Sequence, residues 1–211
     1  MATKKTPKNS RKTVNPQCDR CKHFDCSQGR DCFDLKEETK SWFRAEPTLL
    51  KIAKAAAEVE AKFYGSATRF EEIALFAREA GFSHLGVAFC KGFREEARIA
   101  CDMLRTHFKI TSVCCKSGGF SKKELRFPLV RKGRKESICN PTGQAELLNR
   151  AGTELNIAMG LCVGHDALFN QRSKAWVTTF VAKDRVLAHN PVGAIYCPYV
   201  KRRLKEGLFS E

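Results

Sequence analysis

The stretch that decides the fold is "HLGVAFCKGFREEARIACDMLRTHFKITSVCC", which runs from His84 to Cys115. It opens and closes with short, continuous apolar runs, residues 84–90 and 109–115, of the kind that form strands buried on both faces. Between them, apolar residues recur at helical spacing and form one face: Phe93, Ala97, Ala100, Cys101, Leu104 and Phe108. A strand, a helix and a second strand in this order predict a parallel βαβ unit with a right-handed crossover.

The same alternation continues toward the C-terminus. A helix is expected after Asn140, a good N-cap, and should stop at Gly152. A third strand is expected at 155–162, then a short helix, then a fourth strand at 176–182. Residues 185–189 are expected to return as an antiparallel fifth strand. The sequence therefore predicts an α/β fold, a three-layer sandwich around a mostly parallel sheet of the flavodoxin or Rossmann kind.

Along its length the chain is expected to divide into four parts. Residues 1–17 read as a disordered basic tail, and residues 18–33 hold four cysteines in a small knuckle. Residues 34–83 read as a linker and N-terminal helices, and residues 84–211 as the α/β domain. The domain is expected to carry a thiolate site at the carboxyl edge of its strands.

Composition narrows the class of protein. Of the 211 residues, 43% are hydrophobic, enough for a real core, and no apolar run approaches the roughly 20 residues of a membrane span. Eleven cysteines without an export signal favour a reducing cytoplasm, where clustered thiols usually serve metal or redox chemistry. The net charge of +15 permits contact with nucleic acid, above all through the basic tail. The oligomeric state stays open.

Four cysteines near the N-terminus have the spacing C-x2-C-x4-C-x5-C; they are Cys18, Cys21, Cys26 and Cys32. So short a segment cannot bury four thiols by itself. A tetrahedral thiolate site would tie the segment together, because metal binding is then also folding energy. The spacing is near that of a zinc knuckle and also admits an iron–sulfur cluster. We therefore expect zinc or [4Fe–4S] at this knuckle, with mobile, solvent-facing thiols as the alternative.

A second group of cysteines is expected at one edge of the sheet. In an open parallel sheet, ligands bind beyond the carboxyl ends of the strands, where the strand order reverses. With the order 2-1-3-4, three strand ends and one helix start meet at that edge, and they carry Cys90, Cys114, Cys115, Cys139 and Cys162. Such a set suits zinc, copper(I) or an iron–sulfur cluster. The alternative is that these cysteines only pack in the core, as we expect for Cys101.

Polar groups beside these thiols are candidates for chemistry. The candidates for binding or protonating a small substrate are His165, Asp166 and Lys116. The candidates for an anion cradle of backbone N–H groups are Ser117, Gly118 and Gly119. The expected fifth strand would carry His189 to the opposite edge of the sheet, so this residue is left out of the site.

The leading hypothesis is a metalloprotein with two thiolate sites that acts on an unknown small molecule or redox partner, by redox or sulfur-transfer chemistry. A second is a zinc-stabilised RNA-binding module without catalysis, with Phe24 and Phe33 as stacking partners. A third is a metal-free thiol enzyme with His165 as the base. The nucleophile of that enzyme would be Cys114, Cys115 or Cys162.

Several longer motifs carry a resemblance to a known family: "AFCKGFREEA" (88–97), "SVCCKSGG" (112–119), "ESICNPTGQAELLN" (136–149), "GLCVGHDALF" (160–169) and "VTTFVAKDRVLAHNPVGAIY" (177–196). With both cysteine sets, they make the chain resemble a bacterial and archaeal family of uncharacterised, cysteine-rich proteins regarded as metal-binding and classed as a domain of unknown function. The likeness covers about residues 17–203. It implies metal binding and no settled activity.

Overall fold

The structure is a computed structural model that describes residues 15–207. The tail expected at residues 1–17 falls almost entirely outside the described residues. The chain forms two compact units, Met1–Ala53 and Lys54–Glu211. The long helix α2 (Pro47–Phe63) begins in the first unit and ends in the second.

The first unit holds the cysteine-rich segment and α1 (Lys36–Ala45). Two short 3₁₀ turns, Cys18–Arg20 and Asp25–Gln28, shape the segment. The Asp31 carboxylate accepts hydrogen bonds from the backbone N–H groups of Leu35 and Lys36, at 3.1 and 2.9 Å. These bonds satisfy donors that the first turn of α1 leaves unpaired, so the segment is tied directly to the helix.

The second unit is built on one sheet with the strand order β2-β1-β3-β4, and every pairing in it is parallel. Its strands are β1 (His84–Phe89), β2 (Lys109–Cys114), β3 (Leu155–Met159) and β4 (Trp176–Val181). The α/β fold and the strand order expected from the sequence are therefore confirmed. Because every strand is parallel, all four carboxyl ends lie at one edge of the sheet.

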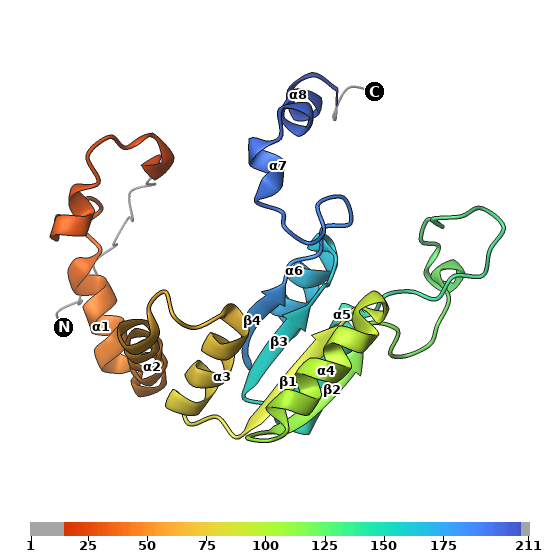
Figure 1. Cartoon of the computed structure of the whole chain (residues 1–211), viewed down its shortest axis with the longest axis horizontal. Helices are drawn as coiled ribbons and strands as arrows, with labels where there is room; N and C mark the ends of the chain where they lie inside the picture. The colour runs from red at the N-terminus through yellow and green to blue at the C-terminus, as the bar shows by residue number, and fades with distance from the viewer. Residues whose placement is uncertain (1–14, 208–211) are drawn as a thin grey trace, which may run out of the picture. The chain divides into compact units, whose positions relative to one another are not determined.

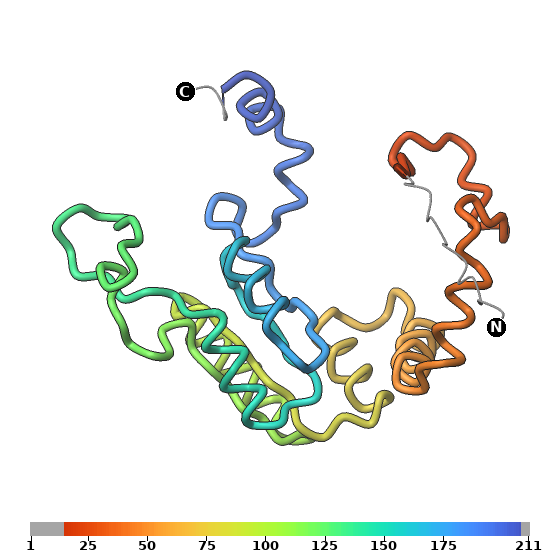
Figure 2. Tube along the Cα trace, turned by 180° about the vertical axis from the view of Figure 1, so that it is seen from behind, coloured from red at the N-terminus to blue at the C-terminus, as the bar shows by residue number. Residues whose placement is uncertain are grey.

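Helices cover both faces of this sheet, with α4 on one face and α5 on the other (Figures 1 and 2). The helices of the unit after α2 are α3 (Arg69–Glu79), α4 (Arg94–Leu104), α5 (Pro141–Ala151), α6 (Val163–Arg172), α7 (Gly193–Tyr196) and α8 (Pro198–Glu206). Side chains alternate along each strand, so Val87 and Ile157 pack with α3 and α4, whereas Ala88 and Ala158 pack with α5 and α6. Both central strands are consequently buried on both sides.

The expected antiparallel fifth strand at 185–189 is wrong. Within the described residues the sheet has four strands, and the chain after β4 makes turns instead. The Asp184 carboxylate accepts the N–H groups of Val186 and Leu187, both at 2.9 Å, and the N–H of Asp184 donates to Nδ1 of His189 at 3.1 Å. Because these groups bond within the turn, they are not available for a strand ladder.

A long segment, residues 116–138, leaves the carboxyl end of β2 and returns to the start of α5 (Figure 1). Glu136 ties its two arms together. Its carboxylate forms an ion pair with Lys122 at 2.8 Å and accepts the N–H groups of Val130 and Arg131. In the part of the chain that the structure describes, no helix is long and apolar enough to cross a membrane.

Candidate thiolate site at the carboxyl edge of the sheet

Four cysteines meet the carboxyl edge from four different segments. Cys90 follows β1, Cys115 follows β2, Cys139 lies two residues before α5, and Cys162 is the N-cap of α6. Backbone hydrogen bonds fix these positions, from Cys90 N–H to the Met159 carbonyl at 3.1 Å and from Cys115 N–H to the Phe89 carbonyl at 2.8 Å. Cys90 and Cys115 are therefore held by the ends of the strand ladder itself.

Three of these thiols hydrogen-bond to one another, with the buried Cys115 in the middle. The hydrogen bonds of Cys115 with Cys139 and with Cys90, together with burial, raise the pKa of Cys115 far above its usual range. The same hydrogen bonds have the opposite effect on the pKa values of Cys90 and Cys139. The hydrogen bond from Cys115 is the largest cause that lowers the pKa of Cys90 and of Cys139. These shifts favour the thiolate form of Cys90 and of Cys139 and the protonated form of Cys115.

Three cations lie directly on the sulfurs. Lys183 Nζ is 2.6 Å from Cys90 Sγ, Lys116 Nζ is 3.3 Å from Cys139 Sγ, and Arg185 donates to Cys162 Sγ at 3.2 Å. Attraction by Cys162, and more weakly by Cys90 and Cys139, raises the pKa of Arg185. The two lysines lower the pKa of the thiols beside them, Lys183 that of Cys90 and Lys116 that of Cys139.

Sequence reasoning missed Lys183 and Arg185 because it placed them in a hairpin. A usable signal was present: if β4 is parallel to its neighbours, the residues just after Val181 must emerge at the thiol edge. His189 is corrected for the same reason. Its ring lies 4.6 Å from the ring of Phe93, three residues after Cys90, so it belongs to this edge and not to the opposite one.

The predicted site residues divide between this cluster and its surroundings. His165 is close enough to Cys139 for its charge to lower the pKa of that thiol, although within residues 15–207 no hydrogen bond joins His165 to Cys162. The Asp166 carboxylate accepts from Asn170 on its own helix, at 3.3 Å, and burial raises its pKa. Cys114 lies apart from the three linked thiols, because adjacent strand residues point to opposite sides, and it lines a cavity instead.

The predicted anion cradle has a suitable backbone. Gly118 and Gly119 both have left-handed φ values, +93° and +65°, which favour glycine. Asn140 donates to the Ser117 carbonyl at 3.1 Å, so the turn is fastened to the start of α5. Among the described residues, Ser117 Oγ is a buried polar atom without a hydrogen-bond partner.

A buried amide supports the strand ends below the thiols. Gln144 of α5 is fully buried, and its Nε2 donates to the carbonyls of Phe89 and Val113 at 3.2 and 2.7 Å. It thus joins the end of β1 to the end of β2, one residue before Cys90 and two before Cys115. The sequence motif around Asn140 predicted the helix, but nothing in its spacing singled out this glutamine.

In the first unit, all four cysteines of the knuckle are exposed. The N–H of Phe24 donates to Cys21 Sγ at 3.4 Å, and with the N–H of His23 it lowers the pKa of Cys21. Phe24 also has a left-handed φ of 52°. Across residues 15–207, no group of three or more His, Cys, Asp or Glu side chains is arranged so that it could hold a metal ion.

The fold and the site together define the class of this protein. It is an α/β protein with a cysteine cluster, flanked by cations, at the carboxyl edge of a parallel sheet. Residues 27–180 match the family described as "Protein of unknown function (DUF1847)", and the chain belongs to that family. It is similar to the Uncharacterized protein MJ0455 of Methanocaldococcus jannaschii, with 46% identity over 192 residues, 90% of this chain and 99% of that protein. No solved structure matches the chain significantly.

Proposed function

We propose that this chain binds a soft metal ion or an iron–sulfur cluster through the thiols at the carboxyl edge of its sheet. The observation that carries the proposal is that Cys90 and Cys139 both hydrogen-bond to Cys115, so that thiols from three separate segments come together. Thiolates are the ligands that zinc, copper(I) and iron–sulfur clusters select. Cys162, held at the same edge by Arg185, is the fourth candidate ligand.

The donor set fits such a group in its chemistry. Metal ligation requires thiolates, and the pKa values of Cys90 and Cys139 are already lowered. Several thiolates around one metal centre leave a net negative charge, and Lys183, Lys116 and Arg185 supply compensating positive charge. The sulfurs currently bond to these cations, so ligation would exchange hydrogen bonds for metal bonds. A bound cluster would supply electron transfer or an open iron site.

The chain's own residues would hold and tune that group. Gln144 fixes the strand ends that carry two ligands, and His165 lies near Cys139 as a group able to hold a proton. Redox or sulfur-transfer chemistry on a small molecule remains the reaction class we predict. The cytoplasm, which keeps such thiols reduced, is the compartment we predict.

We extend the proposal to a second metal site, zinc or [4Fe–4S], at the N-terminal knuckle. The hydrogen bond from Phe24 N–H to Cys21 Sγ supports it, because backbone N–H groups stabilise thiolates. The other support is the set of left-handed turns at Phe24 and Gly29, which reverse the chain around the cysteines. Metal binding would then also contribute to the folding of this exposed segment.

The test is anaerobic purification followed by iron, sulfide and zinc analysis of the full chain and two variants. Cys139→Ser keeps the side-chain size close but removes a soft ligand, so metal at the inner site should fall while the knuckle stays filled. Cys101→Ser is the matched control, since Cys101 is buried on α4 away from the cluster. Full metal content in Cys139→Ser, or no metal beyond that of the knuckle in the wild type, would remove the inner site.

One observation favours a second candidate, thiol chemistry without an inner metal. The nucleophile would then be Cys90, because Cys115 and Lys183 together lower the pKa of Cys90 to about 4. This differs from the sequence-based choice of Cys114, Cys115 or Cys162. Rapid alkylation of one cysteine in protein purified with its metal content intact would favour the thiol enzyme. Protection of all inner cysteines until a chelator is added would favour the metal.

A further inference from the structure

A separate cavity of about 640 Å³ lies beside the thiolate cluster. It is bounded by the carboxyl ends of β1 and β2, the start of α4 and the returning arm of the 116–138 segment. Its lining consists of Phe89, Lys91, Arg94, Cys114, Lys116, Lys135 and Ser137. Four of these seven side chains are cations, and none is a carboxylate.

Three of the four lining cations have no carboxylate within ion-pair distance among the described residues. Lys91, Arg94 and Lys135 form no salt bridge with any carboxylate in residues 15–207. On the same helix as Arg94, by contrast, Arg98 pairs with Glu95, and Arg105 pairs with Asp102 at 2.6 Å. Arg94 thus lies at the end of α4 that borders the cavity without the close ion pair that Arg98 and Arg105 have.

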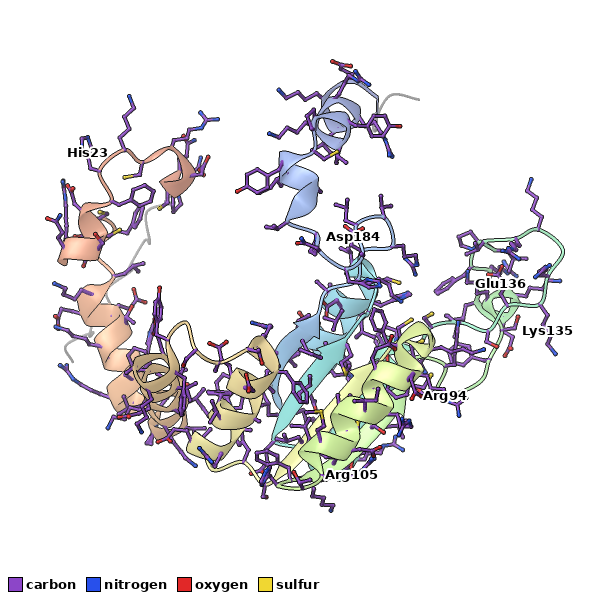
Figure 3. The ribbon with its side chains drawn as sticks, viewed as in Figure 1. His23, Arg94, Arg105, Lys135, Glu136 and Asp184 are labelled. Atoms are coloured by element: carbon purple, nitrogen blue, oxygen red, sulfur yellow. The ribbon has the colours of Figure 1, made fainter. Side chains whose placement is uncertain are left out.

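The Glu136 carboxylate, next to Lys135 of the lining, is already engaged. Glu136 neighbours Lys135 in sequence (Figure 3), but it binds Lys122 at 2.8 Å and accepts two backbone N–H groups. These contacts lower the pKa of Glu136 to about 2, so the carboxylate stays ionised and bound within its own segment. The positive end of the α4 dipole adds to the field of the cations, since the helix begins at Arg94.

We propose that this cavity binds a small organic diphosphate, whose charged group pyrophosphate represents. A phosphate group carries two charges and several acceptor oxygens, which match an arginine fork and a set of lysine ammonium groups. The hydroxyl of Ser137 adds a donor. A cavity of about 640 Å³ is much larger than inorganic phosphate requires, so the rest of the space fits an organic group beside Phe89 and Cys114.

This site goes beyond the proposed metal centre, although one residue joins the two. Lys116 lines the cavity and also donates to Cys139 Sγ at 3.3 Å and to the Ser137 carbonyl at 2.7 Å. A phosphate bound in the cavity would therefore lie within one lysine side chain of the thiolates. A substrate held by its phosphate at this point would present its other end to the cluster.

The experiment is isothermal titration of the full chain with pyrophosphate and with inorganic phosphate at constant ionic strength. Pyrophosphate should bind more tightly, and Arg94→Gln and Lys135→Gln should each weaken its binding about tenfold through the loss of one charge-assisted contact. Arg105→Gln is the matched control. It removes the same charge from the opposite end of α4, as Figure 3 shows, and should leave affinity unchanged.

A second measurement keeps the test independent of folding. Pyrophosphate should slow alkylation of Cys114 in the wild type but not in Arg94→Gln, whose circular dichroism should match that of the wild type. Equal affinity in all variants would overturn the proposal, as would the absence of pyrophosphate binding at millimolar concentration. So would binding of mixed RNA alone, weakened equally by Arg94→Gln and Arg105→Gln, since that is a nonspecific polyanion surface. Metal content is not expected to change in any variant.

Discussion

Lys183→Met tests the electrostatics of the thiolate cluster most directly. The ammonium group lies 2.6 Å from Cys90 Sγ and lowers the pKa of Cys90 by both hydrogen bonding and charge, second to the hydrogen bond from Cys115. A hydrogen bond to a charged group is worth about 1.5 to 3 kcal/mol, and one pKa unit corresponds to about 1.4 kcal/mol. Solvent reaches this edge, and screening favours the lower end of that range. We therefore expect the pKa of Cys90 to rise by about one unit.

The assay is the alkylation rate of Cys90 in reduced, metal-free protein as a function of pH, read by peptide mass spectrometry. With a wild-type pKa of about 4, reactivity should stay level down to mildly acidic pH. In Lys183→Met the alkylation rate should begin to fall at a pH about one unit higher than in the wild type. In the most acidic samples the rate should approach about one tenth of the wild-type rate. Lys174→Met is the control, because Lys174 precedes β4 at the opposite edge of the sheet. A Lys183→Met profile that coincides with wild type would refute the assigned role of Lys183.

The same shift has a consequence for stability. The folded-state pKa of Cys90 lies below its unfolded value, so the unfolded chain binds more protons between the two values. The stabilisation is fully present above the unfolded pKa, near 8.5 for a free thiol, and is lost as pH falls through the folded value. Lys183→Met should therefore reduce the gain in stability that wild type shows between mildly acidic and neutral pH.

Three further predictions concern the framework of the site. Gln144→Leu removes two buried hydrogen bonds but also a buried, unpartnered Oε1, so the free energy of unfolding in urea should fall by only about 1 to 2 kcal/mol. Glu136→Gln breaks the ion pair with Lys122 and should speed trypsin cleavage within 116–138 while the sheet stays intact. Gly160→Ala places a Cβ against the ring of Phe93 at a φ of +62°, so the unfolding midpoint should drop by an amount equivalent to more than about 1 kcal/mol.

Sequence patterns predicted the sheet well because its strands are short, continuous apolar runs. Strands β1 and β3 are buried on both faces, and such strands are recognisable in a sequence as continuous apolar runs. The helix α5 is recognisable by its N-cap, Asn140, and by the glycine at which it ends, Gly152. The thiol edge followed from topology alone, since parallel strands must end together. Parallel topology therefore predicts that Cys90, Cys115, Cys139 and Cys162 lie at one edge, as they do.

Details that depend on side-chain direction were out of reach of the sequence. Whether Cys114 or Cys115 faces the cluster depends on the register of β2, and the two residues point to different surroundings. The turn after β4 was misread because "KDRVLAH" contains an apolar pair that also suits a strand. The Asp184 side chain decides against the strand by capturing two N–H groups, a local competition that hydrophobic patterning does not register.

The contrast between Cys101 and the edge cysteines argues that the cluster is more than packing. Cys101 sits in the core on α4, and burial raises the pKa of its thiol, as expected of a small hydrophobe. At the edge of the sheet, burial also raises the pKa of Cys90 and of Cys139. Hydrogen bonds and neighbouring cations outweigh this effect, so that both pKa values are lowered. Holding thiolates and ammonium groups partly out of water costs free energy that apolar side chains would not. A fold that only needed filled space at its strand ends would not require Lys183 and Lys116 there, so the two cations support the proposed function of this edge over simple packing.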